Sequence, residues 1–253
     1  MKIQYCSDLH LEFLQNNKFI QKYPLLPVGD ILIMAGDIVP FALLDEQAAF
    51  FDWLADNFET TYWIPGNHEY YHWDTTTRSG AVKETIRSNV FLLNNQTIQL
   101  DAVRLIFSTL WSCISPQAGW LIQRRMADFS AIRCHGYPFT PDDYNSLHLQ
   151  CKNFITDALA VKVATPTMVV THHVPTFLHY PAKYKRDSLN EAFASELHSL
   201  IEESDIDYWL YGHHHFNTPM FNIGNTKLIT NQLGYIKFFE NTGFKRDAAV
   251  EFS

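Results

Sequence analysis

Short apolar runs that end directly in aspartate, asparagine or histidine recur along most of the chain. Seven of the twelve histidines lie at such places, namely His10, His68, His172, His173, His213, His214 and His215. The carboxyl ends of strands are where an α/β sheet binds its ligands, because loops converge there on a crevice. The pattern therefore predicts an α/β fold in which several strands deliver polar side chains to one site.

The apolar runs have the length and the β-branched and aromatic content of strands, and they alternate with longer amphipathic stretches. Asn94-Asn95 lies between two such runs and predicts a hairpin turn, and Asp101-Ala102 is a second candidate. The middle of the chain would then be an antiparallel meander. We expect strands at residues 2–6, 30–35, 61–64, 90–93, 97–100, 103–107, 167–171, 207–211, 226–230 and 235–239.

Three stretches carry apolar residues three or four positions apart, the spacing of a helix with one buried face. Ser188 and Glu191 could form a capping box before the third stretch, and Asn190 would be an equally good cap. The predicted helices cover residues 46–58, 147–159 and 193–201.

Residues 111–143 lack such a period and are rich in turn residues, so we expect an insertion over one face of the domain, which we call the cap segment. No linker rich in glycine, serine or proline divides the chain. Residues 1–253 are therefore predicted to form a single domain.

Composition excludes several classes of protein. Hydrophobic residues make up 47% and charged residues 18%, which is typical of a globular chain. The net charge of −8 argues against binding nucleic acid through a basic surface. The four cysteines form no C-x-x-C motif, which argues against a disulfide scaffold or a thiolate zinc site and favours the cytoplasm. We expect no signal peptide and no membrane span, because no apolar run is long enough.

Two of the polar motifs follow the first two predicted strands. Asp8 and His10 are two residues apart, and on an extended chain they point to the same side, so both can reach one cation. This D-x-H pattern is short enough to occur by chance. Asp37 follows Gly36, where an aspartate is either the cap of the next helix or a ligand. Alone, neither motif decides between a structural and a metal-binding role.

The third motif, Gly66-Asn67-His68-Glu69, combines three kinds of chemistry. Its glycine permits a sharp turn and a close backbone approach. Its asparagine offers an amide oxygen as a ligand, and its histidine can donate a proton. A turn that carries a surface histidine is the alternative, and we favour the functional interpretation.

The last two motifs are histidine clusters. His172-His173 ends one predicted strand, and His213-His214-His215 follows Gly212 after another. His213 and His215 share a side of an extended chain and His214 opposes them. Three successive histidines at a strand end, away from the termini, are difficult to explain by packing.

Together the motifs supply nitrogen and oxygen donors suited to Zn, Mn, Fe, Co or Ni, and not to an ion selected by thiolates. Seven side chains are too many for one ion but suit two ions that share a bridging carboxylate. Two ions about 3.5–4 Å apart can clamp a displacement at phosphorus. The seven predicted ligands are Asp8, His10, Asp37, Asn67, His172, His213 and His215.

The motifs follow one another as D-x-H, G-D, G-N-H-E, V-x-x-H and G-H-x-H, from Asp8 to His215. This order resembles the calcineurin-like metallophosphoesterase superfamily, and five motifs in order are far more specific than any one. Residues 193–197, Asn231 and Gly234-Tyr235 further resemble a bacterial subgroup of predicted phosphohydrolases. The resemblance implies a four-layer α/β/β/α sandwich built on two mixed sheets.

Carried over by residue, the resemblance implies two metal sites that share Asp37. It places Asp8, His10 and His215 on one ion, and Asn67, His172 and His213 on the other. It makes His68 the acid for the leaving group or a stabiliser of the transition state, with Glu69 bracing it. Asn67 and His68 would also contact the substrate. His214 receives no ligand role and is expected behind the ligands or facing outward.

The implied function is hydrolysis of phosphate esters by a dinuclear metal centre, with a metal-bridging hydroxide as nucleophile and His68 as general acid. The expected cofactors are two ions of Mn, Fe, Zn, Co or Ni, with Mn favoured. The expected partner is a small phosphorylated substrate, nucleotide-like compounds included, and both phosphatase and phosphodiesterase activity stay open. The alternatives are a metal-dependent nuclease and, less favoured, a non-catalytic protein-binding scaffold.

Overall fold

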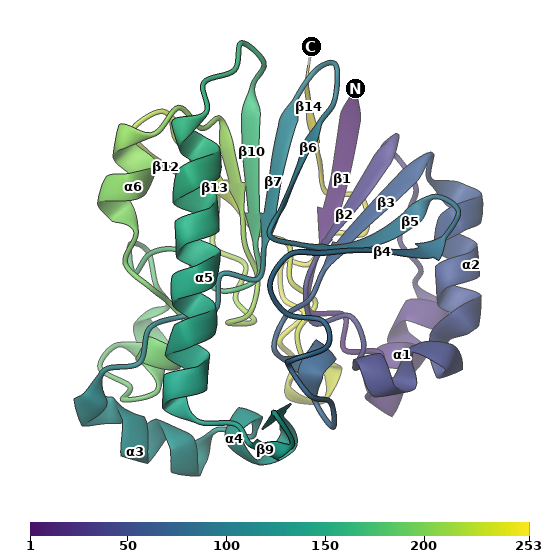
Figure 1. The fold of residues 1–253 in the computed structure, drawn as a ribbon. Coiled ribbons are helices and arrows are strands. Elements are labelled where there is room, and N and C mark those ends of the chain that lie inside the picture. The colour runs from purple at the N-terminus through teal and green to yellow at the C-terminus, as the bar shows by residue number, and fades with distance from the viewer. Residues whose placement is uncertain (253) are drawn as a thin grey trace.

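The computed structural model describes residues 1–252 as two six-stranded mixed sheets that pack face to face (Figure 1). The strands of the first sheet are β1 (Lys2–Cys6), β2 (Ile31–Ala35), β3 (Thr60–Ile64), β4 (Val82–Arg87), β5 (Val90–Asn94) and β14 (Ala249–Glu251), in the order β14-β1-β2-β3-β5-β4. Those of the second are β6 (Gln96–Gln99), β7 (Arg104–Ser108), β10 (Thr167–Thr171), β11 (Tyr208–Leu210), β12 (Phe221–Ile223) and β13 (Thr226–Ile229), in the order β12-β13-β11-β10-β7-β6.

Helices cover the outer face of each sheet, which confirms the predicted four-layer α/β/β/α sandwich (Figure 1). α2 (Ala48–Asn57) packs on the first sheet beside α1 (Leu14–Lys22), and α5 (Pro141–Ala160) and α6 (His198–Glu203) pack on the second. α3 (Pro116–Arg125), α4 (Asp128–Ala131) and a small hairpin of β8 (Arg133–Cys134) and β9 (Tyr137–Pro138) lie beyond one end of the sheets. Within residues 1–252, none of the helices combines the length and apolar character needed to cross a bilayer.

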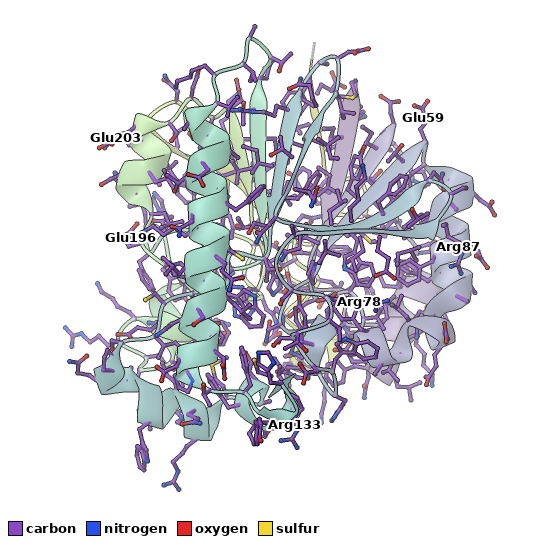
Figure 2. All side chains as sticks on the ribbon, in the orientation of Figure 1. Glu59, Arg78, Arg87, Arg133, Glu196 and Glu203 are labelled. Atoms are coloured by element: carbon purple, nitrogen blue, oxygen red, sulfur yellow. The ribbon has the colours of Figure 1, made fainter. Side chains whose placement is uncertain are left out.

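Alternate residues of the central strands enter two different apolar layers. In β2, Ile31 and Ile33 pack between the sheets, whereas Leu32 and Met34 pack under the helices. A strand that is apolar on both faces is typical of a parallel sheet covered on both sides. Charged side chains such as Glu59, Glu196 and Glu203 are exposed on the outside of the molecule (Figure 2).

The strands that precede the polar motifs are parallel within each sheet. β1, β2 and β3 are neighbours in one sheet, and β10 and β11 are neighbours in the other. Their carboxyl ends therefore meet at one edge of the sandwich. In Figure 1 this edge lies below the sheets, because β1 runs downward from the N-terminus.

The hairpin predicted at Asn94-Asn95 is wrong, because β5 and β6 belong to different sheets. The chain instead crosses from one sheet to the other at Asn94-Asn95, and the two amide side chains bind this crossing segment to the end of β7. Oδ1 of Asn94 accepts from the backbone N–H of Thr109 at 2.8 Å, and Oδ1 of Asn95 accepts from the hydroxyl of Ser108 at 2.7 Å. The turn predicted at Asp101-Ala102 is confirmed by the antiparallel pairing of β6 with β7.

The strand predicted at residues 235–239 is also wrong, since a 3-10 helix forms at Ile236–Phe238. Side chains capture the backbone N–H groups that a strand would offer to a neighbour: Tyr235 N–H donates to Glu240 and Ile236 N–H donates to Asn16. Phe239, with φ of +59°, then takes the chain out of any extended conformation.

The third predicted helix begins later than expected, at His198. The capping box of Ser188 and Glu191 does not form there. The Glu191 carboxylate instead accepts from the backbone N–H of Ser115, at the start of α3. This contact joins the loop before α6 to the cap segment.

Candidate metal centre

The turns that follow the strands have an unusual backbone. Five of the seven predicted metal ligands have positive φ angles: Asp8 (57°), His10 (48°), Asp37 (55°), His213 (79°) and His215 (49°). Residues other than glycine rarely adopt this region, and such strain collects at functional sites that the surroundings hold in place. Here backbone hydrogen bonds join the turns, from Asp8 N to Gly36 O at 2.9 Å and from His10 N to Asp37 O at 3.0 Å.

The structure brings four of the predicted ligands together in one group. Donor atoms of Asp8, His10, Asp37 and His215 all lie within 4.8 Å of one another. Nε2 of His10 is 2.9 Å from Nε2 of His215 and 3.7 Å from a carboxylate oxygen of Asp37. Nε2 of His215 is 3.3 Å from Oδ1 of Asp8. This group could hold one metal ion.

A second group lies beside the first and contains the remaining three. Nε2 of His172 is 3.1 Å from Nδ1 of His213, 3.4 Å from Oδ1 of Asp37 and 3.3 Å from Oδ1 of Asn67. All four side chains are buried. Asp37 thus belongs to both groups, with one carboxylate oxygen directed to each.

Each clustered imidazole has an inner nitrogen, which faces the other donor atoms, and an outer nitrogen, which faces away from them. The outer nitrogen lies close to an oxygen acceptor in all four rings. Nδ1 of His172 lies 2.9 Å from the carbonyl of Ala35, and Nε2 of His213 lies 3.3 Å from that of Ala192. Likewise Nδ1 of His10 is 3.1 Å from Glu12 and Nδ1 of His215 is 2.6 Å from Glu240. A proton on the outer nitrogen leaves a lone pair on the inner one.

Inner nitrogens that face each other at about 3 Å have no proton to share when both imidazoles are neutral. A cation between them removes the conflict, so the donor set fits metal ions. The absence of a side chain at Gly66 leaves room for this arrangement. A Cβ on Gly66 would clash with Oδ1 of Asp37 and lie 2.6 Å from Nε2 of His172.

The charges of the cluster are strongly linked. Burial opposes protonation of His172 and His215, yet the Asp37 carboxylate raises the pKa of His172 to about 9, and hydrogen bonds to Asp8 and Glu240 raise the pKa of His215 to about 10. Burial also disfavours the ionised forms of Asp8 and Asp37, but neighbouring imidazoles lower the pKa of both carboxyl groups. The two carboxylates therefore stabilise positive charge in the site, on protonated imidazoles or on a bound cation.

Glu69 does not brace His68, contrary to the prediction. Its carboxylate accepts from the backbone N–H groups of Asp37 at 2.9 Å, Ile38 at 2.7 Å and Gly66 at 2.6 Å, and from the indole of Trp63 at 3.1 Å. Glu69 is buried in the 3-10 helix that follows Asn67, and it contacts the ends of β2 and β3 rather than His68. It holds the turns after β2 and β3 together.

His68 is instead held by Glu12, a residue that the sequence interpretation missed. Oε1 of Glu12 lies 2.9 Å from Nδ1 of His68 and 3.1 Å from Nδ1 of His10. Burial favours the neutral acid, but the charge and hydrogen bonds of the two histidines lower the pKa of Glu12 to about 2. Its position two residues after His10 was the available signal, since an acidic residue there is next to the D-x-H motif in the sequence.

The other nitrogen of His68 faces the hydroxyl of Tyr235 at 3.2 Å, and the ring stacks on Tyr71 with centroids 4.1 Å apart. Asp128, from the cap segment, accepts from Nδ2 of Asn67 at 2.9 Å and from Tyr71 at 2.7 Å. Burial raises the pKa of Asp128 despite these hydrogen bonds. His214 is buried against Gln232 and lies outside both donor groups.

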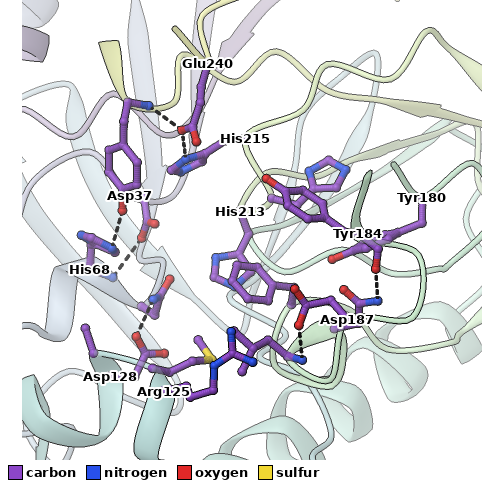
Figure 3. Close-up of a pocket in the computed structure, with 18 of the residues that line it drawn as sticks. Asp37, His68, Arg125, Asp128, Tyr180, Tyr184, Asp187, His213, His215 and Glu240 are labelled. Atoms are coloured by element: carbon purple, nitrogen blue, oxygen red, sulfur yellow. Dashed lines mark hydrogen bonds and ion pairs between the residues drawn. The ribbon is translucent and has the colours of Figure 1, made fainter. Parts of the chain in front are cut away.

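A cavity of about 330 Å³ opens onto the cluster (Figure 3). Figure 3 shows Asp37, His68 and His215 toward the left, His213 near the centre, and Tyr180 and Tyr184 toward the right. Four of its residues come from the cap segment, Arg125 to Asp128. The full lining is Asp37, Asn67, His68, Tyr71, Arg125, Met126, Ala127, Asp128, Tyr180, Tyr184, Asp187, Leu189, Asn190, Phe193, His213, His214, His215, Tyr235 and Glu240.

Comparisons with a family model, with other protein sequences and with solved structures all give matches. The model of a family described as calcineurin-like phosphoesterase matches residues 1–217. The uncharacterized protein L509 of Acanthamoeba polyphaga mimivirus is 30% identical over 259 residues, which cover 92% of this chain and 91% of that protein. The phosphopantetheinyl hydrolase PptH of Mycobacterium tuberculosis has a similar fold, with a TM-score of 0.72 at 16% identity over 98% of this chain and 95% of that one.

Proposed function

The chain belongs to the calcineurin-like phosphoesterase family, which makes it a metal-dependent phosphoesterase, and we propose that the residues gathered at its strand ends bind two metal ions and hydrolyse a small phosphorylated substrate. The observation that carries this proposal is the position of Asp37. It is the one residue common to the two donor groups, and each group is large enough to hold an ion.

In this proposal one ion is held by Asp8, His10 and His215 and the other by Asn67, His172 and His213, while Asp37 bridges both. The distances within each group support this division. Four imidazoles, two carboxylates and one amide suit transition metals, and Mn is our first choice. When bound, two such ions lower the pKa of a water molecule and neutralise the phosphoryl oxygens.

His68 acts as the general acid. Its Nδ1 is taken by Glu12, so Nε2 is the nitrogen that can deliver a proton to the leaving oxygen. Burial alone would lower the pKa of His68, but the carboxylates of Asp37 and Glu12 raise it above the ordinary value, which favours the protonated ring that a general acid requires. In this proposal Asn67, beside it on the same turn, would also contact a phosphoryl oxygen.

The cap segment, residues 111–143, forms one wall of the cavity within a single domain of residues 1–253. The cavity has the size of a small ligand. Asp128, Asp187 and Glu240 line it and Arg125 is the only lysine or arginine among its lining residues. This excess of acidic over basic side chains disfavours the binding of a long polyanion, and it supports a small substrate over the nuclease alternative.

The test begins with protein loaded with Mn, Zn, Fe, Co or Ni and assayed on phosphomonoesters and phosphodiesters, with a phosphopantetheinyl ester included because PptH is named for that activity. Wild-type protein should turn over at least one ester, and lack of turnover with every ion would overturn the proposal.

Two variants then separate the roles. Asp37→Asn should lose at least one bound ion by elemental analysis, and retention of both ions would reject the bridging role. His68→Ala should keep its ions but lose about 10²- to 10⁴-fold in kcat. Unchanged kcat on an ester with a poor leaving group would remove His68 from the reaction.

A further inference from the structure

We propose that the hydroxyl of Tyr235 is a second hydrogen-bond donor at the leaving oxygen of the substrate, shared with His68. This inference rests on the proposed function. Its basis is that Oη of Tyr235 lies within hydrogen-bond distance, 3.2 Å, of Nε2 of His68, the nitrogen to which we assign the proton transfer. An oxygen atom can lie about 2.8 Å from both atoms at once, because their separation is well below two hydrogen-bond lengths.

The backbone around Tyr235 is built to place this side chain. Gly234 has φ of +67°, and a Cβ there would lie 2.8 Å from Cβ of Glu240. Asn16, buried in α1, donates to the carbonyl of Gly234 at 2.8 Å and accepts from the N–H of Ile236 at 3.2 Å. The loop is therefore anchored on both sides of Tyr235.

The same loop is tied to the candidate metal centre. Oε2 of Glu240 accepts from the backbone N–H of Tyr235 at 2.9 Å and lies 2.6 Å from Nδ1 of His215. The phenol ring rests against the rings of His10 and His215, with centroids 4.7 Å and 4.5 Å away. These contacts fix the ring, and the hydroxyl at its tip reaches His68 in the cavity.

The reaction step balances without any further component. Water forms the new bond to phosphorus and releases a proton to the solvent, from which His68 is later reprotonated, while the bond from phosphorus to the ester oxygen breaks and its electron pair stays on that oxygen. The oxygen takes the proton from Nε2 of His68, while Tyr235 keeps its own proton and stabilises the developing negative charge through a hydrogen bond. Oriented donors of this kind lower the barrier because they are in place before charge develops.

The decisive variant is Tyr235→Phe, which removes the hydroxyl and retains the ring. The probe is 4-nitrophenyl phosphate or bis(4-nitrophenyl) phosphate, whichever the Mn-loaded wild type hydrolyses, together with its unsubstituted phenyl counterpart. Nitrophenolate is a good leaving group and needs little stabilisation. We expect kcat for the phenyl ester to fall about 10- to 100-fold and kcat for the nitrophenyl ester to fall about three-fold or less, with metal content unchanged.

Tyr137→Phe is the matched control, because Tyr137 is 75% exposed on the β8–β9 hairpin and does not line the cavity. Tyr235→Ala, which also loses the packing on His10 and His215, should reduce metal content as well. An equal loss of kcat on both esters in Tyr235→Phe, or no loss on either, would overturn the inference. An inactive wild type would instead overturn the proposed function, so the two failures are distinguishable.

Discussion

Asn67 donates a hydrogen bond of 2.9 Å from its amide nitrogen to Oδ1 of Asp128. Asn67 follows β3, whereas Asp128 begins α4 in the cap segment. Because the amide nitrogen is engaged, the amide oxygen faces Nε2 of His172 at 3.3 Å. The cap segment thereby sets the orientation of a residue that we propose as a metal ligand.

Asp128→Ala should weaken metal binding at the site of Asn67, His172 and His213. Loss of a residue that orients a ligand typically costs about 10- to 100-fold in metal affinity. Titration of metal-free protein with Mn by calorimetry would measure the change, and Asp101→Ala removes an exposed acid on the β6–β7 turn as a control. Equal affinity in Asp128→Ala and wild type would show that Asn67 keeps its orientation without Asp128.

Glu12→Gln should reduce catalysis through His68. One oxygen of Glu12 lies within hydrogen-bond distance of both His10 and His68, and the neutral amide of glutamine accepts a hydrogen bond from either ring more weakly than a carboxylate does. We expect kcat to fall about ten-fold or more at saturating Mn, chiefly for poor leaving groups. Stopped assays on the nitrophenyl ester and on its unsubstituted phenyl counterpart would measure the change in kcat. If kcat fell only at low Mn and equalled that of the wild type at saturating Mn, Glu12 would act in metal binding alone.

The sequence predicted the elements in which the local pattern and the tertiary structure agree. The strands before Asp8, Asp37 and His172 are rich in apolar and β-branched residues, and their ends were predicted to within one residue. α1 was missed because its sequence, LQNNKFIQK, is largely polar and has no side-chain cap. β4, with its sequence VKETIR, was missed because it is a polar edge strand whose place depends on pairing with β5.

Within the candidate site, residue types and spacing identified every side chain of the two donor groups as a predicted ligand. They did not identify Glu12 as the partner of His68, nor Asp128, because those contacts join segments that are far apart in the sequence. Glu69 was assigned to the wrong neighbour for the same reason. Its four donors lie in the turns after β2 and β3 and in β3, and only the packed structure brings them together.

Glu69→Gln should lower stability more than it lowers activity per folded molecule. Glutamine can accept some of the four N–H bonds, but its own NH₂ group then faces backbone donors with no acceptor. Leaving such buried groups unsatisfied costs about 1–3 kcal/mol each. Urea unfolding of the metal-free protein would show the loss, with Glu59→Gln as an exposed control. Equal midpoints for the two variants would contradict this account of Glu69.

Removal of the metal should make stability depend on alkaline pH. In metal-free protein the pKa values of His172 and His215 are raised to about 9 and about 10, so the folded state binds more protons than the unfolded state above about pH 6.5. Their stabilisation is complete below that pH and disappears as the pH rises through 9 to 10. Mn-loaded protein should show a smaller decline, because the inner nitrogens of both rings bind the ions instead of protons. Thermal unfolding from pH 6.5 to 10, with and without chelator, would measure both curves. Parallel curves would mean that His172 and His215 do not exchange protons for metal.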